Sequence, residues 1–244
     1  MILAPATSPA RRLATVGLLT LLLGGCSTVP NVTPTPSPTA GATIPPTTPP
    51  YTLAPAPSGC PTAAPAAMSG TATVTMATNF GNIVIKVDAG LGANAAGTFV
   101  ALSQCGYYNN VVFHRIVKGF VIQAGDGTYA RMPTLTQSKM GTGGPGWTIP
   151  DDKVTTAYKR GTVAMANTGA ANSGSSQFFI VLSDTAWTST TPKTYSIFGN
   201  VTSGLDVVDR IALVPTGGEP GSDGSPASMP LQPIVITGTT ITTP

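Results

Sequence analysis

The sequence predicts a mostly β fold, a closed and mainly antiparallel barrel with two α-helices. Three observations support this fold class. Apolar and polar residues alternate over several short segments, glycine-containing turns separate these segments, and only two segments show the helical spacing of apolar residues. Many short strands with few helices are typical of a barrel whose sheet closes on itself.

The folded part begins near Thr71 with a predicted hairpin. Apolar side chains alternate with threonines from Ala72 to Met76, which indicates a strand with one buried face. Residues 79–82 contain asparagine and glycine and form the predicted turn. The alternation resumes over residues 83–87, which indicates the returning strand.

The next predicted element is a helix over residues 95–105. Phe99 and Leu102 lie three residues apart, as they do on one face of a helix, and Gly106 is its predicted C-terminal cap. The remaining predicted elements are short strands and turns up to Gly199, a helix over 205–212 that Pro215 ends, and a last strand over 234–241.

Residues 1–25 are predicted to be a lipoprotein signal peptide. Arg11 and Arg12 provide its positive start, and the apolar run 13–23 is too short to span a bilayer. The run ends in Leu23-Gly24-Gly25-Cys26, which resembles the bacterial lipobox, where the cysteine is lipidated and becomes the mature N-terminus. The alternative is an ordinary secretory signal in which the cysteine has no such role.

Residues 26–70 are predicted to be a disordered linker that carries the lipidated Cys26. The segment is rich in proline, threonine and alanine, so it has too little apolar surface to fold alone. Extended at roughly 3.1 Å per residue, it would reach on the order of 100 Å. We expect it to hold the domain over residues 71–244 away from a membrane; a rival interpretation is a ligand for a proline-binding module.

Composition excludes several classes of function. The formal net charge is +3 and only 9% of the residues are charged, which gives no electrostatic reason to expect a nucleic acid partner. The chain has one histidine, His114, so a site with two histidine ligands is excluded. We expect neither a metal nor another cofactor.

The chain has three cysteines, and lipidation of Cys26 leaves two of them as thiols. In an exported protein Cys60 and Cys105 can form a disulfide. The position of Cys60 beside the linker makes two free thiols an equal alternative, and the sequence leaves both open.

Three segments carry the most specific patterns in the chain. They are VFHRIVKGFVIQAGD (112–126), GTGGPG (141–146), and GTVAMAN (161–167) followed by SSQFFI (175–180). Their order and spacing resemble the cyclophilins, a family of peptidyl-prolyl cis/trans isomerases, from about Thr73 to Ile241. The resemblance implies the family's fold, an eight-stranded antiparallel barrel capped by two α-helices, in agreement with the predicted class.

The resemblance also implies roles for individual residues. Arg115 matches the arginine that contacts the substrate's prolyl amide, and Gln123 and Asn167 match residues that hold the substrate backbone; these three are the predicted catalytic residues. Phe120 and Phe179 match the walls of the proline pocket. The predicted substrate-binding residues are Phe120, Val121, Met165, Ala166, Gln177, Phe179, Trp187, Thr188 and Tyr195.

The chemistry of prolyl isomerisation fits such a set. Rotation about a peptide bond has a barrier of about 18–20 kcal/mol, because resonance gives the C–N bond double-bond character. A catalyst needs neither nucleophile nor acid; it must bind the twisted amide better than either planar form. In the twisted state the nitrogen regains a lone pair, which a fixed guanidinium such as that of Arg115 can hydrogen-bond.

Three of the predicted binding positions depart from the family. Tyr195 stands where many members have histidine, Thr188 where leucine is common, and Val121 where methionine is common. About three residues are inserted between Trp187 and Tyr195, and residues 128–140 match no family segment. The family is associated with cyclosporin, which occupies the proline groove, so we expect cyclosporin-like cyclic peptides to bind this chain with reduced affinity.

Several residues in these segments have simpler interpretations. We expect Phe113 and Phe178 to lie in the core and His114 to be structural. The glycine-rich stretch 141–144 lacks the lysine and the helix start of a phosphate loop. A hydrolase is disfavoured by the single histidine and by the lack of a nucleophile motif.

The sequence therefore predicts a prolyl isomerase that acts on proline-containing segments of exported proteins and assists their folding. We expect a monomer, lipid-anchored on the extracytoplasmic face of the cell membrane. The alternative is a catalytically weak module of the cell envelope that binds proline-containing peptides. Arg115 favours the enzyme, because a pure binding module does not need it.

Overall fold

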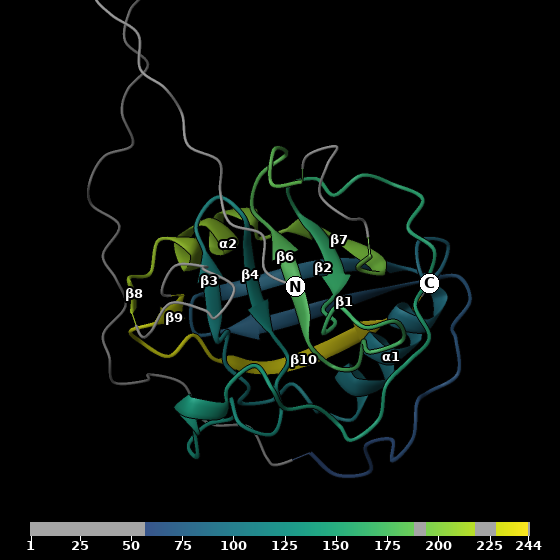
Figure 1. The fold of residues 1–244 in the computed structure, drawn as a ribbon, viewed down its shortest axis with the longest axis horizontal. Coiled ribbons are helices and arrows are strands. Elements are labelled where there is room, and N and C mark those ends of the chain that lie inside the picture. The colour runs from purple at the N-terminus through teal and green to yellow at the C-terminus, as the bar shows by residue number, and fades with distance from the viewer. Residues whose placement is uncertain (1–56, 188–193, 218–227, 244) are drawn as a thin grey trace, which may run out of the picture. The chain divides into compact units, whose positions relative to one another are not determined.

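The computed structural model describes residues 57–187, 194–217 and 228–243 (Figure 1). The predicted signal peptide, Cys26 and Thr188 lie outside these ranges. The helices are α1 (Ala93–Gln104), α2 (Leu205–Ala212) and the 3-10 turn η1 (Gln137–Lys139). The strands are β1 (Thr71–Thr78), β2 (Gly81–Asp88), β3 (Arg115–Val117), β4 (Val121–Ala124), β5 (Thr162–Met165), β6 (Phe178–Val181), β7 (Ile197–Ser203), β8 (Thr216–Gly217), β9 (Met229–Pro230) and β10 (Ile236–Thr242).

Eight of these strands form one antiparallel sheet in the order β10-β1-β2-β7-β5-β6-β4-β3, and β8 and β9 pair separately. The helices lie at opposite ends of the sheet (Figure 1). Helix α1 packs against β10, β7 and β2, and helix α2 packs against β2 and β4. Within the described ranges, neither helix combines the length and the apolar character that crossing a bilayer requires.

The sheet is an open half-barrel, so the predicted closure of the barrel is wrong. Strands β3 and β10 are its free edges and do not pair. The N–H of Ile116 in β3 donates instead to the carbonyl of Ser228 (2.7 Å). The chain between this contact and β10 contains Pro230 and Pro233, which lack the N–H group that a ladder needs. Three backbone hydrogen bonds and an isolated bridge join residues 110–113, which precede β3, to residues 234–236 at the start of β10, but they do not extend into β3.

The first hairpin is confirmed. Strands β1 and β2 pair along their full length, from Thr71 opposite Asp88 to Thr78 opposite Gly81. Along β1 every second residue is buried, as the alternation with threonine predicts. This strict alternation fixes the register, because a slip by one residue would turn the buried face toward solvent.

The main core lies between the sheet and α1. The ring of Phe99 in α1 packs against the rings of Phe178 (centroids 5.2 Å apart) and Phe198 (4.8 Å). Phe113 and Phe178 are both fully buried in this core. Their prediction as core residues is confirmed.

Helix α1 starts two residues earlier and ends one residue earlier than predicted, and Gly106 follows its C-cap residue Cys105. Gly106 adopts a positive φ of 75°, and the N–H of Tyr107 donates to the carbonyl of Leu102 (2.9 Å), which terminates the helix in a Schellman motif. At the other end, the carboxylate of Asp152 accepts two backbone N–H groups of the first turn (3.1 and 2.9 Å). This contact favours a start at Ala93, because a negative charge stabilises a helix N-terminus.

Residues 57–70, which we call the strap, lie against α1 although their composition assigned them to the linker. A disulfide joins Cys60 to Cys105 at the end of α1, with Cα atoms 5.1 Å apart. The indole N–H of Trp147 donates to the carbonyl of Pro61 (3.1 Å), and the strap donates one backbone hydrogen bond to the first residue of α1 (3.1 Å). The folded domain therefore includes the strap.

Replacing Cys60 and Cys105 together with serine is expected to lower the free energy of unfolding by roughly 2–4 kcal/mol. The disulfide closes a loop with a sequence separation of 45 residues, and the loss of that constraint releases entropy in the unfolded chain. Urea denaturation followed by circular dichroism measures the effect. Ser58→Ala, an exposed change in the strap, is the control. An unfolding free energy of the double serine variant equal to that of the wild type would contradict a stabilising disulfide between Cys60 and Cys105.

Candidate active site

The candidate site is built on three neighbouring strands, β3, β4 and β6. Antiparallel pairing places Arg115 opposite Gln123, and Gln123 opposite Phe179. Directly opposite residues project to the same face of a sheet, so these three side chains share one face. The register thus brings together residues that are far apart in the sequence.

A continuous chain of side-chain hydrogen bonds orients the arginine. Nη1 of Arg115 donates to Oε1 of Gln123 (3.2 Å), and Nε2 of Gln123 donates to Oε1 of Gln177 (2.9 Å). Nε2 of Gln177 then donates to the carbonyls of Gly141 and Gly143, both at 2.9 Å. We call this set the amide relay. It leaves each amide only one orientation that satisfies its partners.

A buried carboxylate holds the glycine-rich loop 141–144 at the end of the amide relay. Asp126 is fully buried, and its Oδ2 accepts the N–H groups of Gly141 (2.8 Å) and Gly143 (3.1 Å). Its Oδ1 accepts two N–H groups of the turn that follows it (3.0 and 2.8 Å). A side chain on Gly143 would collide with this carboxylate. Two backbone N–H groups of the loop therefore bind the side chain of Asp126.

Five aromatic residues form a cluster beside the arginine. Trp187 stacks between Phe120 (centroids 4.6 Å apart) and Tyr158 (4.4 Å). Phe179 lies 5.5 Å from Trp187 and 5.3 Å from Tyr195. Trp187, Phe120 and Tyr195 stay half-buried, so this aromatic cluster presents an apolar surface that solvent still reaches.

Tyr158 is a member of the aromatic cluster that the sequence did not reveal. Its hydroxyl donates to the backbone carbonyl of Tyr195 (2.7 Å) and accepts the N–H of the same residue (3.0 Å). Burial raises the pKa of Tyr158 to about 12, so the hydroxyl keeps its proton at neutral pH. Tyr158 therefore fixes the backbone that carries Tyr195. Its position in a loop before β5 has no periodic signal that could have marked it.

The remaining predicted residues lie at different depths. Val121 is buried within the aromatic cluster, whereas Met165 is buried in the main core. The backbone N–H of Ala166 donates to the carbonyl of Gln177 (2.8 Å). The side chain of Asn167 is half-buried and donates to a backbone carbonyl (3.0 Å).

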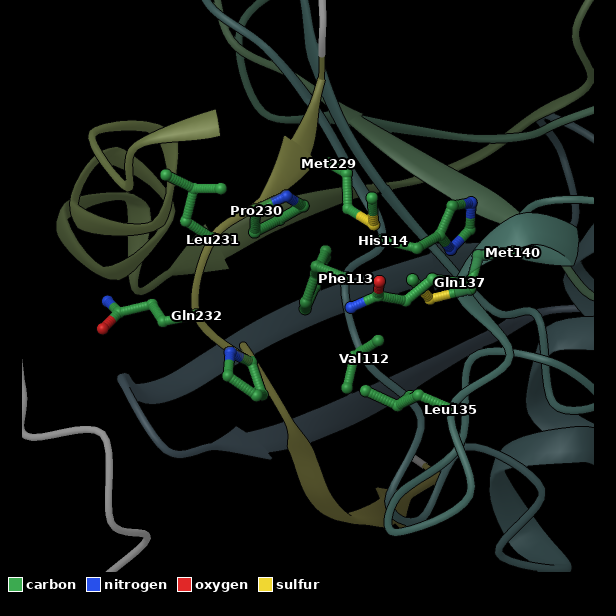
Figure 2. Close-up of a pocket in the computed structure, with 11 residues that line it drawn as sticks. Val112, Phe113, His114, Leu135, Gln137, Met140, Met229, Pro230, Leu231 and Gln232 are labelled. Atoms are coloured by element: carbon green, nitrogen blue, oxygen red, sulfur yellow. The ribbon is translucent and has the colours of Figure 1, made fainter. Parts of the chain in front are cut away.

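His114 lies beside a different concavity. It lines a small pocket of about 70 Å³ formed by residues from segments 112–114, 135–140 and 229–233, none of which is a predicted site residue (Figure 2). Neither ring nitrogen has a hydrogen-bond partner in the described part of the chain. Burial lowers the pKa of His114 to about 4, and nearby Asp126 opposes this only in part. The imidazole is therefore neutral at pH 7 and stands outside the site.

The comparisons with known proteins identify the family. The family model described as cyclophilin type peptidyl-prolyl cis-trans isomerase/CLD matches residues 73–241. A peptidyl-prolyl cis-trans isomerase of Streptomyces antibioticus is 35% identical over 170 residues, which cover 68% of this chain and 95% of the relative. One of Acinetobacter baylyi is 36% identical over 165 residues, 67% of this chain and 81% of the relative.

Solved structures agree with this assignment. A crystal structure of a cyclophilin type peptidyl-prolyl cis-trans isomerase from Cryptosporidium parvum superposes with a TM-score of 0.57 at 28% identity, over 71% of this chain and 99% of that one. A structure of the same protein in the presence of the dipeptide Ala-Pro gives a TM-score of 0.56. The chain belongs to the cyclophilin-type peptidyl-prolyl cis-trans isomerases. It is an enzyme that accelerates rotation about X-Pro peptide bonds.

The single histidine makes the pH dependence of stability testable. Because the pKa of His114 is about 4 in the folded chain and ordinarily 6.5, the unfolded chain binds the proton more readily between these values. As the pH falls from 7 to 4, the wild type is expected to lose roughly 3 kcal/mol more unfolding free energy than His114→Gln. Urea titrations of both proteins across this range measure the difference. If the unfolding free energies of the two proteins changed equally with pH, the lowered pKa of His114 would be contradicted.

Proposed function

We propose that Arg115 is the residue that stabilises the twisted prolyl amide in this enzyme. The observation that carries this proposal is the amide relay, which holds one side of the guanidinium against Gln123. A guanidinium has five N–H donors, and Arg115 makes no other hydrogen bond among the described residues. The remaining donors are available to the substrate.

The chemistry needs a donor already in place when the amide twists. A hydrogen bond from Arg115 to the pyramidal nitrogen weakens the resonance that resists rotation. The guanidinium keeps its charge at any physiological pH, so no protonation step limits the reaction. A fixed donor also avoids reorganisation at the moment of rotation, which is the usual source of electrostatic catalysis.

The aromatic cluster supplies the complementary part of the proposed site. Phe120 and Phe179 are the proposed walls for the proline ring, and Ala166 and Asn167 the proposed grip on the substrate backbone. The Cryptosporidium structure in the presence of Ala-Pro supports proline-containing peptides as the substrate class. With one side of the bond held in this way, the other side is free to rotate.

Arg115→Ala is expected to lower kcat/KM for a short X-Pro peptide about 100- to 1,000-fold, because a preorganised donor acts mainly in the transition state. Arg160→Ala is the matched control, since Arg160 forms a partly exposed ion pair with Asp209 (2.7 Å). A coupled isomerisation assay measures both variants. A folded Arg115→Ala enzyme with unchanged kcat/KM would refute the proposed role.

The same assay decides between the enzyme and the alternative of a weak binding module. A module would bind the peptide, detected by a shift in its NMR signals, while kcat/KM stayed near the uncatalysed limit in the wild type. The location of Arg115 at the end of the amide relay favours the enzyme.

The second part of the proposal concerns location. We place the enzyme on the extracytoplasmic face of the cell membrane, as a monomer anchored by a lipid on Cys26, where it assists the folding of exported proteins. The segment Leu23-Gly24-Gly25-Cys26 after an apolar run supports the anchor. The disulfide between Cys60 and Cys105 supports an oxidising compartment.

Mass spectrometry of the protein purified from membranes tests the anchor. The mature N-terminus is expected at Cys26 with a diacylglyceryl group, and Cys26→Ala is expected to release the protein or block its processing. A mature chain that begins elsewhere, or a Cys26 without lipid, would exclude the lipoprotein form.

The third part of the proposal is that cyclosporin competes with peptide for the same groove, with reduced affinity. Thr188 in place of leucine removes apolar contact worth roughly 1–2 kcal/mol, or about tenfold in affinity. Titration of Trp187 fluorescence should show saturable quenching or enhancement. Trp147 also emits, so Trp187→Phe is the control. No saturable, Trp187-dependent change at high micromolar cyclosporin would contradict this assignment of the groove.

A further inference from the structure

We propose that the enzyme's own proline-rich segment, residues 42–56, is an intramolecular ligand of its proline site. We call this segment the arm. The proposal rests on the proposed function of the site and adds a substrate that the chain itself supplies. Its consequences are faster isomerisation of the arm's X-Pro bonds and competition between the arm and external peptides.

The first observation is where the arm joins the domain. The strap is fastened by the disulfide between Cys60 and Cys105 and by the hydrogen bond from Trp147 to Pro61 (3.1 Å). Trp147 lies four residues after Gly143, whose carbonyl accepts the Gln177 side chain at the end of the amide relay (2.9 Å). The strap is therefore tied to the segment that supports the site.

These contacts bound the distance from the strap to the site. Pro61 and Gln177 are connected by two hydrogen bonds, two side chains and a stretch of four residues. A fully extended chain spans at most about 3.6 Å per residue, so the two residues lie on the order of 30 Å apart at most.

The arm is long enough to cover this distance. The described strap begins at residue 57, which residues 45–50 precede by between 7 and 12 positions. A proline-rich segment extends by about 3.1 Å per residue, so these positions can reach roughly 20–35 Å from the start of the strap. The reach of the arm's more distant prolines is therefore of the same order as the distance to the site.

The chemistry of the arm matches the aromatic cluster. The arm contains Ile44-Pro45-Pro46, Thr48-Pro49-Pro50 and Ala54-Pro55, and no charged residue occurs between positions 27 and 67. Binding therefore needs no desolvation of an ionised side chain of the arm. A short tether whose length matches the span gives an effective concentration on the order of 1 mM, which lets even a weakly bound segment compete with external peptides.

Exchange spectroscopy by NMR tests the proposal on the chain from residue 26 onward with Cys26→Ser. Uncatalysed X-Pro exchange takes about 10–100 s. In the intact chain, cis/trans exchange at Pro45 or Pro49 is expected to be at least tenfold faster than in a separate peptide of residues 42–56. Arg115→Ala should abolish the acceleration.

A second measurement gives an independent readout. Replacing the arm prolines at 45, 46, 49, 50 and 55 with alanine is expected to lower the apparent KM for an added X-Pro peptide about twofold. The reason is that an arm whose effective concentration is near its Kd for the groove would occupy half of the wild-type sites. The control carries Thr47→Ala and Thr52→Ala, which keep every proline. The ratio of the two KM values should not depend on enzyme concentration.

The outcomes separate this inference from the proposed function. Arm bonds that exchange no faster than in the free peptide, in an enzyme that still turns over the added peptide, overturn the inference alone. If the wild-type enzyme accelerated neither the arm bonds nor the added peptide, the proposed function and the inference would both be overturned. A KM ratio that grows with enzyme concentration would place the arm of a second copy in the groove, and would overturn the intramolecular proposal.

Discussion

The site depends on one constraint, the orientation of the Arg115 guanidinium by the amide relay. Arginine has a long side chain that loses about 2 kcal/mol of rotamer freedom when it is fixed, so an unsupported arginine would sample many positions. Gln123 holds the guanidinium, Gln177 holds Gln123, and two loop carbonyls hold Gln177. The buried Asp126 fixes that loop through its N–H groups. Each member of the chain is therefore placed by the next, and the series ends at the fully buried Asp126, which gives the fixed geometry that a preorganised donor needs.

The fold provides this constraint through strand register. The pairing of β3, β4 and β6 sets Arg115, Gln123 and Phe179 on one face of the sheet, so the charged group and the apolar wall are fixed relative to each other by backbone hydrogen bonds. Tyr158 performs a similar task for the aromatic cluster, because its hydroxyl bonds both the N–H and the carbonyl of Tyr195. The open edges of the half-barrel lie at β3 and β10 and leave this register intact.

Local signals in the sequence were sufficient to predict the first hairpin and the end of α1. The alternation of apolar residues and the glycine at position 106 each determine the backbone within a few residues. The site residues were found by resemblance, and the register explains why they meet. The closed barrel was wrong because closure depends on β3 and β10, which are distant in sequence and separated by prolines. The composition of the strap predicts a linker. Its position against α1 depends on contacts with Cys105 and Trp147, and no local sequence pattern reveals these contacts. The contacts of Asp126 with Gly141 and Gly143, and those of Tyr158 with Tyr195, likewise join residues far apart in the sequence.

A double-mutant cycle on the amide relay tests this account most directly. Gln123→Leu, Gln177→Leu and the double variant are compared with the wild type by kcat/KM, after circular dichroism has shown that each is folded. If the two glutamines act through one orientation of Arg115, the double variant loses no more kcat/KM than the worse single variant. Losses that multiply, or a Gln177→Leu enzyme with full activity, would contradict the claim that the relay positions the arginine.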